Sequence, residues 1–176
     1  MADVGIILGS DSDLPKVKEC FEVLEQFNVS FEIIISSAHR TPTQAMEWAS
    51  TAVKRGIKVI IAVAGGAAHL PGVVAAHTIL PVIGVPVETN IAGGIDSILS
   101  IIQMPAGIPV AAMAAGKAGG ANAALFAISI LSLTNKSYTE RLERYRKDMA
   151  EKISGRNDTL NQMGVKEYIK MKEAGK

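Results

Sequence analysis

The stretch Phe31–Pro42, which reads FEIIISSAHRTP, decides the fold of this chain. Its first five residues are apolar apart from Glu32 and rich in β-branched side chains, as in a buried parallel strand, and a helical pattern begins at Pro42. The junction between them, Ser36–Pro42, gathers hydroxyls, an imidazole and a guanidinium. Open α/β sheets bind their ligands in the crevice outside the carboxyl ends of the strands. The stretch therefore predicts both a parallel sheet and a binding site at its edge.

The rest of the chain repeats this alternation of short apolar runs and helical patterns. Further strands are expected at Val4–Leu8, Val59–Val63, Val82–Val85 and Ile108–Ala111. Helices are expected around residues 14–24 and 45–53, from about Pro71 to Thr78, from about Ile95 to Ile102, and from about Ala121 to Thr134. This order predicts an α/β fold of three αβα layers, in which a doubly wound, flavodoxin-like parallel sheet has right-handed crossovers.

After Asn135 the composition becomes polar. One apolar stripe of a further helix remains, and it could pack on its own domain or on a neighbouring subunit: Tyr138, Leu142, Tyr145, Met149 and Ile153. We expect a single catalytic domain over residues 1–154 that includes this C-terminal packing helix. Residues 155–176 form a polar tail, in which a short helix is expected near Val165–Met171.

The overall composition limits the classes of partner. A chain of 176 residues fits one domain, and 18 Lys and Arg against 17 Asp and Glu create no basic field for a nucleic-acid backbone. The single cysteine, Cys20, cannot form an intrachain disulfide, and the N-terminal residues do not resemble a secretory signal. We therefore expect a cytoplasmic protein that binds neither nucleic acid nor a membrane.

The stretch between Val59 and Asn135 contains only three Asp, Glu, Lys or Arg residues: Glu88, Asp96 and Lys117. A membrane span would explain such a stretch, but Gly and Pro interrupt it and leave no run of about 20 apolar residues. A parallel sheet buried on both faces, with further surface covered by other subunits, fits better. This pattern predicts a large, apolar interface in a homo-oligomer.

The first loop at the sheet edge is Gly9–Asp13, which reads GSDSD. Ser12 or Asp11 could simply cap the following helix. Four small polar residues after a glycine also suit phosphate binding through free N–H groups and serine hydroxyls. Since Asp11 and Asp13 would repel a phosphate, at least one of them is expected to face sugar hydroxyls. The loop therefore predicts a phosphorylated sugar as ligand.

The second loop is the Ser36–Pro42 junction itself. Thr41–Gln44 reads as a capping box with proline at the first helical position, which would fix the backbone just before it. A histidine such as His39 can move protons near neutral pH, and an arginine such as Arg40 can clamp a phosphate or carboxylate. Most histidines are structural, but the position of His39 beside Arg40 and Ser37 favours a catalytic role.

The third loop, Ala64–Gly72, is rich in small residues. Its glycine pair would let the backbone approach a planar ligand, and its N–H groups could form a concavity for a carboxylate. The structural alternative is a tight turn that needs a positive φ, for which one glycine would suffice. His69 either orients the loop or contacts the ligand, and the sequence leaves both open.

Several catalytic and cofactor motifs are missing from the sequence. It contains no G-x-G-x-x-G dinucleotide fingerprint, no Walker A loop, no clustered zinc ligands and no G-x-S-x-G nucleophile elbow. We therefore expect no metal and no cofactor, and a site that works with protons and hydrogen bonds.

Six motifs in this order resemble one family, the class I N5-carboxyaminoimidazole ribonucleotide mutases of bacterial-type purine biosynthesis, which are related to the catalytic subunit of phosphoribosylaminoimidazole carboxylase. The resemblance covers about residues 4–145. Its motifs are Gly9–Asp13, Ser37–Pro42, Ala64–Gly72, Pro81–Val87, Gln103–Pro105 and Ala118–Ala124. Two positions depart from the usual pattern, and both are expected to affect packing: Ala115 replaces a larger aliphatic residue and Gly120 replaces an alanine.

The resemblance implies a cytoplasmic homo-octamer that acts as an isomerase in de novo purine (IMP) biosynthesis, without metal or cofactor. It would move a carboxylate from the exocyclic nitrogen of the aminoimidazole ribonucleotide to ring carbon 4, by decarboxylation and recarboxylation. His39 would be the catalytic proton shuttle. The other implied residues bind substrate. The ribonucleotide would be held by Ser10, Asp13 and Arg40, assisted by Ser12 and Ser37. The ring and its carboxylate would be surrounded by Gly65, Gly66, Ala67, Ala68, His69 and Leu70, and a site would be closed, in the same subunit or in a neighbour, by Gln103, Met104 and Pro105.

Two alternatives remain. A related carboxylase uses free carbon dioxide and the uncarboxylated ribonucleotide, but its third loop usually lacks the Ala-Ala-His-Leu-Pro pattern seen at residues 67–71, which favours the mutase. A flavodoxin-like module could also bind a nucleotide or flavin without catalysis. Only 5% of the residues are aromatic, with one tryptophan, and this argues against flavin stacking.

Overall fold

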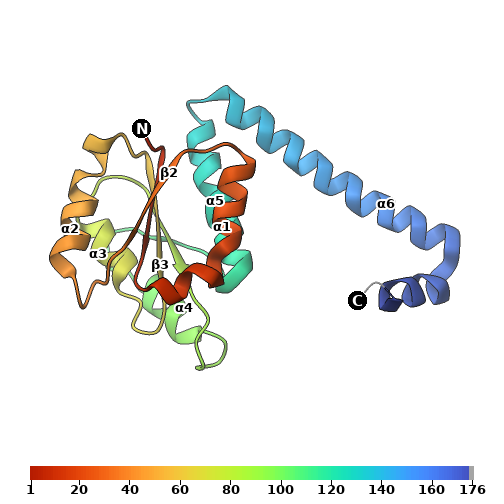
Figure 1. The fold of residues 1–176 in the computed structure, drawn as a ribbon, viewed down its shortest axis with the longest axis horizontal. Helices are drawn as coiled ribbons and strands as arrows, with labels where there is room; N and C mark the ends of the chain where they lie inside the picture. Colours follow the sequence, from red (N-terminus) through yellow and green to blue (C-terminus); the bar gives the residue numbers. More distant parts are fainter. Residues whose placement is uncertain (175–176) are drawn as a thin grey trace.

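The computed structural model describes residues 1–174 and contains one parallel sheet of five strands (Figure 1). The strands are β1 (Val4–Leu8), β2 (Phe31–Ile35), β3 (Val59–Ala64), β4 (Val82–Pro86) and β5 (Ala111–Ala112), arranged in the order β2-β1-β3-β4-β5. This is the flavodoxin-like order, so the predicted fold class is confirmed.

The fifth strand is shorter and later than expected. The run Ile108–Ala111 predicted a four-residue strand, but β5 contains only Ala111 and Ala112. Gly107 adopts a positive φ of 100° and Pro109 has no N–H to donate. The backbone therefore joins the ladder only after Pro109.

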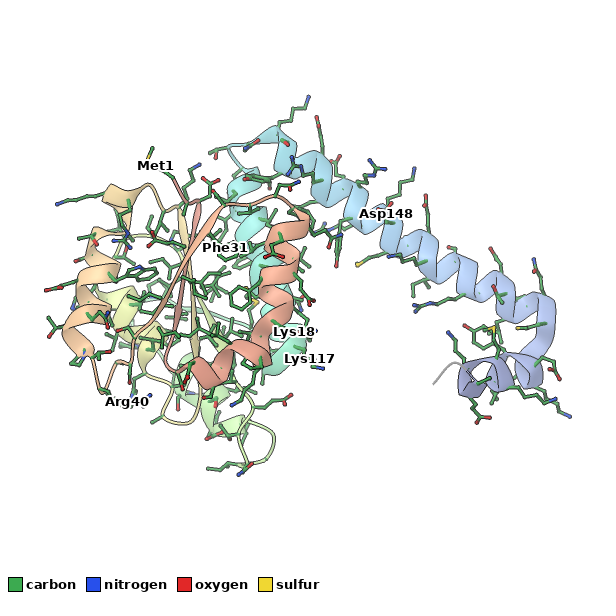
Figure 2. The ribbon with its side chains drawn as sticks, in the orientation of Figure 1. Met1, Lys18, Phe31, Arg40, Lys117 and Asp148 are labelled. Atoms are coloured by element: carbon green, nitrogen blue, oxygen red, sulfur yellow. The ribbon has the colours of Figure 1, made fainter. Side chains whose placement is uncertain are left out.

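Helices cover both faces of the sheet and complete the three layers (Figure 1). One face carries α1 (Lys18–Gln26), which follows the 3₁₀ helix η1 (Asp11–Val17), and α5 (Gly116–Ser132). The other face carries α2 (Pro42–Thr51), the short 3₁₀ helix η2 (Val53–Arg55), α3 (Leu70–Ala76) and α4 (Ile95–Ile102). Each face has its own apolar core, and the side chains of both fill the space between the layers (Figure 2).

Helix α5 begins at Gly116 rather than near Ala121. Glycine pairs usually weaken a helix, which is why the sequence suggested a later start. Here the glycines permit close packing instead. A Cβ at Gly119 would lie 1.7 Å from the Ala114 carbonyl oxygen, and one at Gly120 would lie 3.2 Å from the Val17 Cα atom. Gly120 is thus a packing position, as the sequence predicted.

The inner strands β1, β3 and β4 are buried along their whole length, as their apolar runs predicted. The prediction that Phe31–Ile35 is buried like them was wrong, because β2 lies at the edge of the sheet, where Ile33 and Ile35 are each 46% exposed. Within residues 1–174, no helix has the length and apolarity that a membrane span requires.

The chain ends in a long helix, α6 (Lys136–Ala174), that leaves the body of the molecule (Figures 1 and 2). Its first turns pack on the core through Tyr138, Leu142 and Tyr145. Farther along, Met149 and Ile153 of the same predicted stripe are 47% and 61% exposed. The helix crosses residue 155 without interruption, so the expected boundary falls inside it. Gly164 breaks it with φ 77° and ψ 161°, and the expected helix at residues 165–171 lies after this break.

Candidate active site

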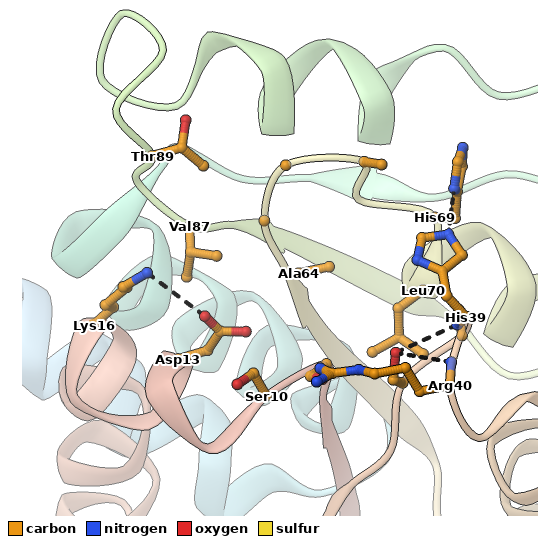
Figure 3. A pocket seen from close by; sticks show the side chains of 16 residues that line it. Ser10, Asp13, Lys16, His39, Arg40, Ala64, His69, Leu70, Val87 and Thr89 are labelled. Carbon is orange, nitrogen blue, oxygen red and sulfur yellow. Dashed lines mark hydrogen bonds and ion pairs between the residues drawn. The ribbon is translucent and has the colours of Figure 1, made fainter.

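A cavity of about 500 Å³ opens at the carboxyl ends of the strands, where the three predicted loops meet (Figure 3). It lies beside the neighbouring strands β1 and β3, whose following helices cover opposite faces of the sheet. Doubly wound sheets bind their ligands at this switch point. Its lining residues are Gly9, Ser10, Asp13, Lys16, Ser37, Ala38, His39, Arg40, Ala64, Gly65, Gly66, Ala67, His69, Leu70, Val87 and Thr89.

The first loop leads into the 3₁₀ helix η1 through a compact set of hydrogen bonds. Ser10 is the N-cap, and its hydroxyl accepts from the Ser12 N–H at 3.3 Å. The same N–H lies 2.9 Å from Asp11 Oδ1. The Ser10 and Ser12 hydroxyls are 2.9 Å apart. Ser10 therefore both caps the helix and lines the cavity, whereas Ser12 supports Ser10 and does not line it.

Asp13 and Lys16 form the charged end of the cavity (Figure 3). The Asp13 side chain is only 10% exposed, and Lys16 Nζ lies 3.7 Å from its Oδ1. Burial raises the pKa of the Asp13 carboxyl above its usual value, and the Lys16 ammonium opposes this shift. Lys16 also donates to the Glu88 carbonyl at 3.4 Å. Lys16 was not predicted from the sequence, although its position one helical turn after Asp13 is a signal for it.

The second loop is held by Thr41, but not through the predicted capping box. Helix α2 does begin at Pro42 with Thr41 as N-cap, yet no side-chain cap bond forms. The Thr41 hydroxyl instead accepts from the Ser37 N–H at 2.9 Å and lies 3.0 Å from the Ser36 hydroxyl. The Ser37 hydroxyl in turn accepts from the N–H groups of His39 and Arg40, each at 3.3 Å. The threonine thus points back into the loop and fixes its shape.

Two side chains of this loop reach the neighbouring loops. Arg40 Nη2 donates to the Gly9 carbonyl at 3.1 Å, which ties the second loop to the first. His39 Nε2 lies 2.8 Å from His69 Nδ1, with the rings almost perpendicular at 88° (Figure 3). In such a contact one nitrogen carries the proton and the other accepts it. The hydrogen-bonded pair of imidazoles lies at the opposite end of the cavity from Lys16.

The third loop needs both of its glycines, for different reasons. Gly66 adopts a positive φ of 68°, which favours glycine. Gly65 packs so tightly that a Cβ would lie 2.5 Å from Val87 Cγ2. The close approach expected toward a ligand is thus made toward Val87 of the protein. The predicted concavity of N–H groups is also smaller, since Gly66, Ala68 and His69 already donate to protein acceptors.

The structure gathers ten of the fifteen residues that the sequence indicated: Ser10, Asp13, Ser37, His39, Arg40, Gly65, Gly66, Ala67, His69 and Leu70. Ala68 is buried behind the loop. Gln103, Met104 and Pro105 do not line this chain's cavity, and Met104 Sδ lies 3.1 Å from the position of a Cβ on Gly72 of α3. Val87 and Thr89 were missed; they follow β4 at the same sheet edge, which was the available signal.

The arrangement has a guanidinium and an ammonium toward one end and an imidazole pair at the other, around a wall of small residues. It can bind an anionic ligand and transfer a proton to or from it. No group of three His, Cys, Asp or Glu within residues 1–174 is arranged to hold a metal ion.

Comparison with known proteins agrees with this chemistry. The family model described as AIR carboxylase matches residues 3–152. N5-carboxyaminoimidazole ribonucleotide mutases from Pyrococcus horikoshii and Thermotoga maritima are 54% and 50% identical, over 94% and 98% of this chain and 93% and 100% of their own. The crystal structure of Treponema denticola PurE superimposes with a TM-score of 0.79 at 29% identity, over 89% of this chain and 97% of that one. The chain belongs to the AIR carboxylase family.

Proposed function

We propose that this chain is a mutase that interconverts N5-carboxyaminoimidazole ribonucleotide and 4-carboxyaminoimidazole ribonucleotide in de novo purine biosynthesis. Near-full-length similarity to two proteins of that name supports the assignment. One observation carries the chemistry, namely the 2.8 Å contact between His39 Nε2 and His69 Nδ1 in a cavity that also holds Arg40. It places an imidazole, a group able to transfer protons, beside a site for an anion.

The lining residues suggest how the substrate lies. Arg40 and the Ser10 hydroxyl would hold the phosphate, with Ser37 fixing the loop that carries Arg40. The largely buried Asp13 carboxylate would accept hydrogen bonds from the ribose hydroxyls. The aminoimidazole ring and its carboxylate would then lie against the loop from Gly65 to Leu70, within reach of His39.

His39 would act as the only acid and base. The carbon–nitrogen bond of the carbamate breaks, carbon dioxide leaves, and His39 gives a proton to the exocyclic nitrogen. Carbon 4 of the electron-rich ring then attacks the same carbon dioxide, and His39 removes the ring proton. The contact with His69 orients the imidazole between the two steps. A single acid–base group contributes about 10²–10⁴-fold, and retention of both fragments in one pocket supplies further rate enhancement.

This mechanism needs a closed pocket, and in the single chain His39, Arg40 and His69 are exposed. We propose that neighbouring subunits of a cytoplasmic homo-octamer complete the enclosure, with Gln103–Pro105 of one subunit covering the cavity of another. Apolar side chains left uncovered on β2, α4 and α6 support such an assembly: Ile33, Ile35, Ile95, Leu99, Ile102, Met149 and Ile153.

The experiment is to incubate the purified protein with N5-carboxyaminoimidazole ribonucleotide at low bicarbonate and follow the carbon-4 product. His39→Asn should lower kcat by at least about 100-fold while substrate binding persists. His77→Asn is the matched control, because the exposed His77 ring contacts the Val73 carbonyl of its own helix and lies outside the cavity. Near-wild-type turnover by His39→Asn would remove that residue from its role.

A second candidate is direct carboxylation of the uncarboxylated ribonucleotide by free carbon dioxide, the reaction after which the matching family is described, but the relatives that match over nearly their full length are mutases and favour the first candidate. The same assay separates the two. A carboxylase would need the uncarboxylated ribonucleotide with added bicarbonate, whereas the mutase would work from the carbamate without it.

A further inference from the structure

Helix α4 holds the third loop from behind through one fully buried hydroxyl. Ser97 of α4 is 0% exposed. It donates to the Val87 carbonyl at 2.9 Å and accepts from the Gly66 N–H at 2.9 Å. Both capacities of this hydroxyl are therefore used, and it joins the end of β4 to the loop that follows β3.

A second serine of the same helix supports the other side of the same residue. The Ser100 hydroxyl lies 3.2 Å from the Gly66 carbonyl and 2.8 Å from the Asp96 carbonyl of its own helix. Gly66 is thus held from α4 at both its N–H and its carbonyl. The Ser100 hydroxyl is shared between two carbonyls, and its bond to Gly66 is the longer of the two. Ser97 is therefore the main restraint on Gly66.

Apart from the packing of Gly65 on Val87 and the turn bonds from the Ala68 and His69 N–H groups, the loop has no large side chain to define its shape on the cavity side. It consists of Gly65, Gly66, Ala67 and Ala68, which carry almost no side chain to pack. Gly66 has a positive φ and nothing lies within 4 Å of the position its Cβ would take. Glycine gains the most freedom when it is released, so the buried hydrogen bonds matter more here than they would in a loop of larger residues.

We infer that Ser97, assisted by Ser100, is a positioning residue that keeps the Gly65–Gly66 wall closed while carbon dioxide is free in the cavity. This inference rests on the proposed function. Carbon dioxide is small and uncharged, so no ion pair can retain it between its departure from nitrogen and its capture by carbon 4. A wall that opens during that interval lets it escape. The uncarboxylated ribonucleotide then remains as a side product.

The test is the partition between the two products, measured on the intact protein with N5-carboxyaminoimidazole ribonucleotide at low bicarbonate. The quantity is the amount of uncarboxylated ribonucleotide released per 4-carboxy product formed, after subtraction of the decay without enzyme. Ser97→Ala should raise this ratio about tenfold, because it leaves the Gly66 N–H and the Val87 carbonyl without their buried partner. Ser100→Ala should raise it less.

Ser129→Ala is the control, because its hydroxyl donates only to the Leu125 carbonyl of its own helix and should leave the ratio unchanged. A purely structural role for Ser97 would reduce the amount of active protein without changing the ratio. A wild-type ratio in Ser97→Ala would overturn the inference. If that variant does not fold, a wild-type ratio in the milder Ser100→Ala would overturn it equally. A wild-type protein without mutase activity would instead contradict the proposed function.

Discussion

At the scale of single residues, the site depends on side chains that hold loops as much as on those that face the cavity. Thr41 ties the second loop through Ser36 and Ser37, and Arg40 ties it to Gly9. The sequence could predict that these loops meet, because parallel strands end at one edge. It could not predict the direction of the Thr41 hydroxyl. This hydroxyl can either cap helix α2 or bond to Ser36 and Ser37 in the loop, and the tertiary structure decides between the two.

Lys16 provides the first test at this scale. Its ammonium lies 3.7 Å from Asp13 Oδ1 and counteracts the effect of burial on that carboxyl, which Asp11 and Arg40 also face. Lys16→Met should raise the pKa of Asp13 further. If substrate binding requires the carboxylate, activity will then be lost at a higher pH on the acid side. The measurement is kcat/KM against pH, with KM rising several-fold near the acid limb.

Lys18→Met is the matched control, because Lys18 pairs with Glu22 on the outer surface and does not line the cavity. Its pH profile should superimpose on that of the wild type. An unchanged acid limb in Lys16→Met would show that Lys16 does not control the charge of Asp13.

At the scale of elements, hydrophobic periodicity predicted each inner strand within about a residue, because burial on both faces leaves little choice of side chain. Periodicity failed to predict where β5 and α5 begin, because backbone geometry rather than side-chain burial determines those positions. Pro109 delays β5, and Gly119 allows α5 to start at Gly116 with its backbone against Ala114. Such close approaches depend on the packing partner, which a single sequence does not reveal.

Gly119→Ala tests that packing. The added Cβ would lie 1.7 Å from the Ala114 carbonyl oxygen, so backbone must move. We expect the free energy of unfolding to fall by about 1–3 kcal/mol or more, as measured by chemical denaturation. Gly155→Ala in α6 is the control, since nothing lies near its Cβ position, and there alanine should be neutral or stabilising by up to about 1 kcal/mol. Equal stabilities for the two variants would contradict this account of α5.

At the scale of the whole molecule, the most unusual feature is α6, which projects from the domain (Figure 1). Several of its apolar side chains are exposed. The sequence predicted its apolar stripe but not where the stripe leaves the core. Tyr145 still packs against Phe27, with ring centroids 5.5 Å apart, whereas Met149 and Ile153 have no such cover. The sequence left open whether this stripe packs on its own domain or on a neighbouring subunit; its first half packs on the domain, and the uncovered half is available for a neighbour.

Ile153→Lys tests this interpretation. A residue that is 61% exposed in the single chain should tolerate lysine without loss of folding, but lysine would be costly in an apolar interface. We expect light scattering to report a smaller assembly, with the thermal unfolding of the domain little changed. Lys152→Ala, at a neighbouring exposed position, should leave the assembly intact. A wild-type mass for Ile153→Lys would exclude this part of α6 from the interface.

In the proposed reaction, one closed cavity transfers a carboxylate from nitrogen to carbon within a single bound molecule. The most direct measurement uses N5-carboxyaminoimidazole ribonucleotide with an isotopically labelled carboxylate, in the presence of excess unlabelled bicarbonate. We expect the 4-carboxy product to retain nearly all of the label after a single turnover. A product that carries mainly unlabelled carboxylate would contradict it, because the carbon dioxide would then have come from solution.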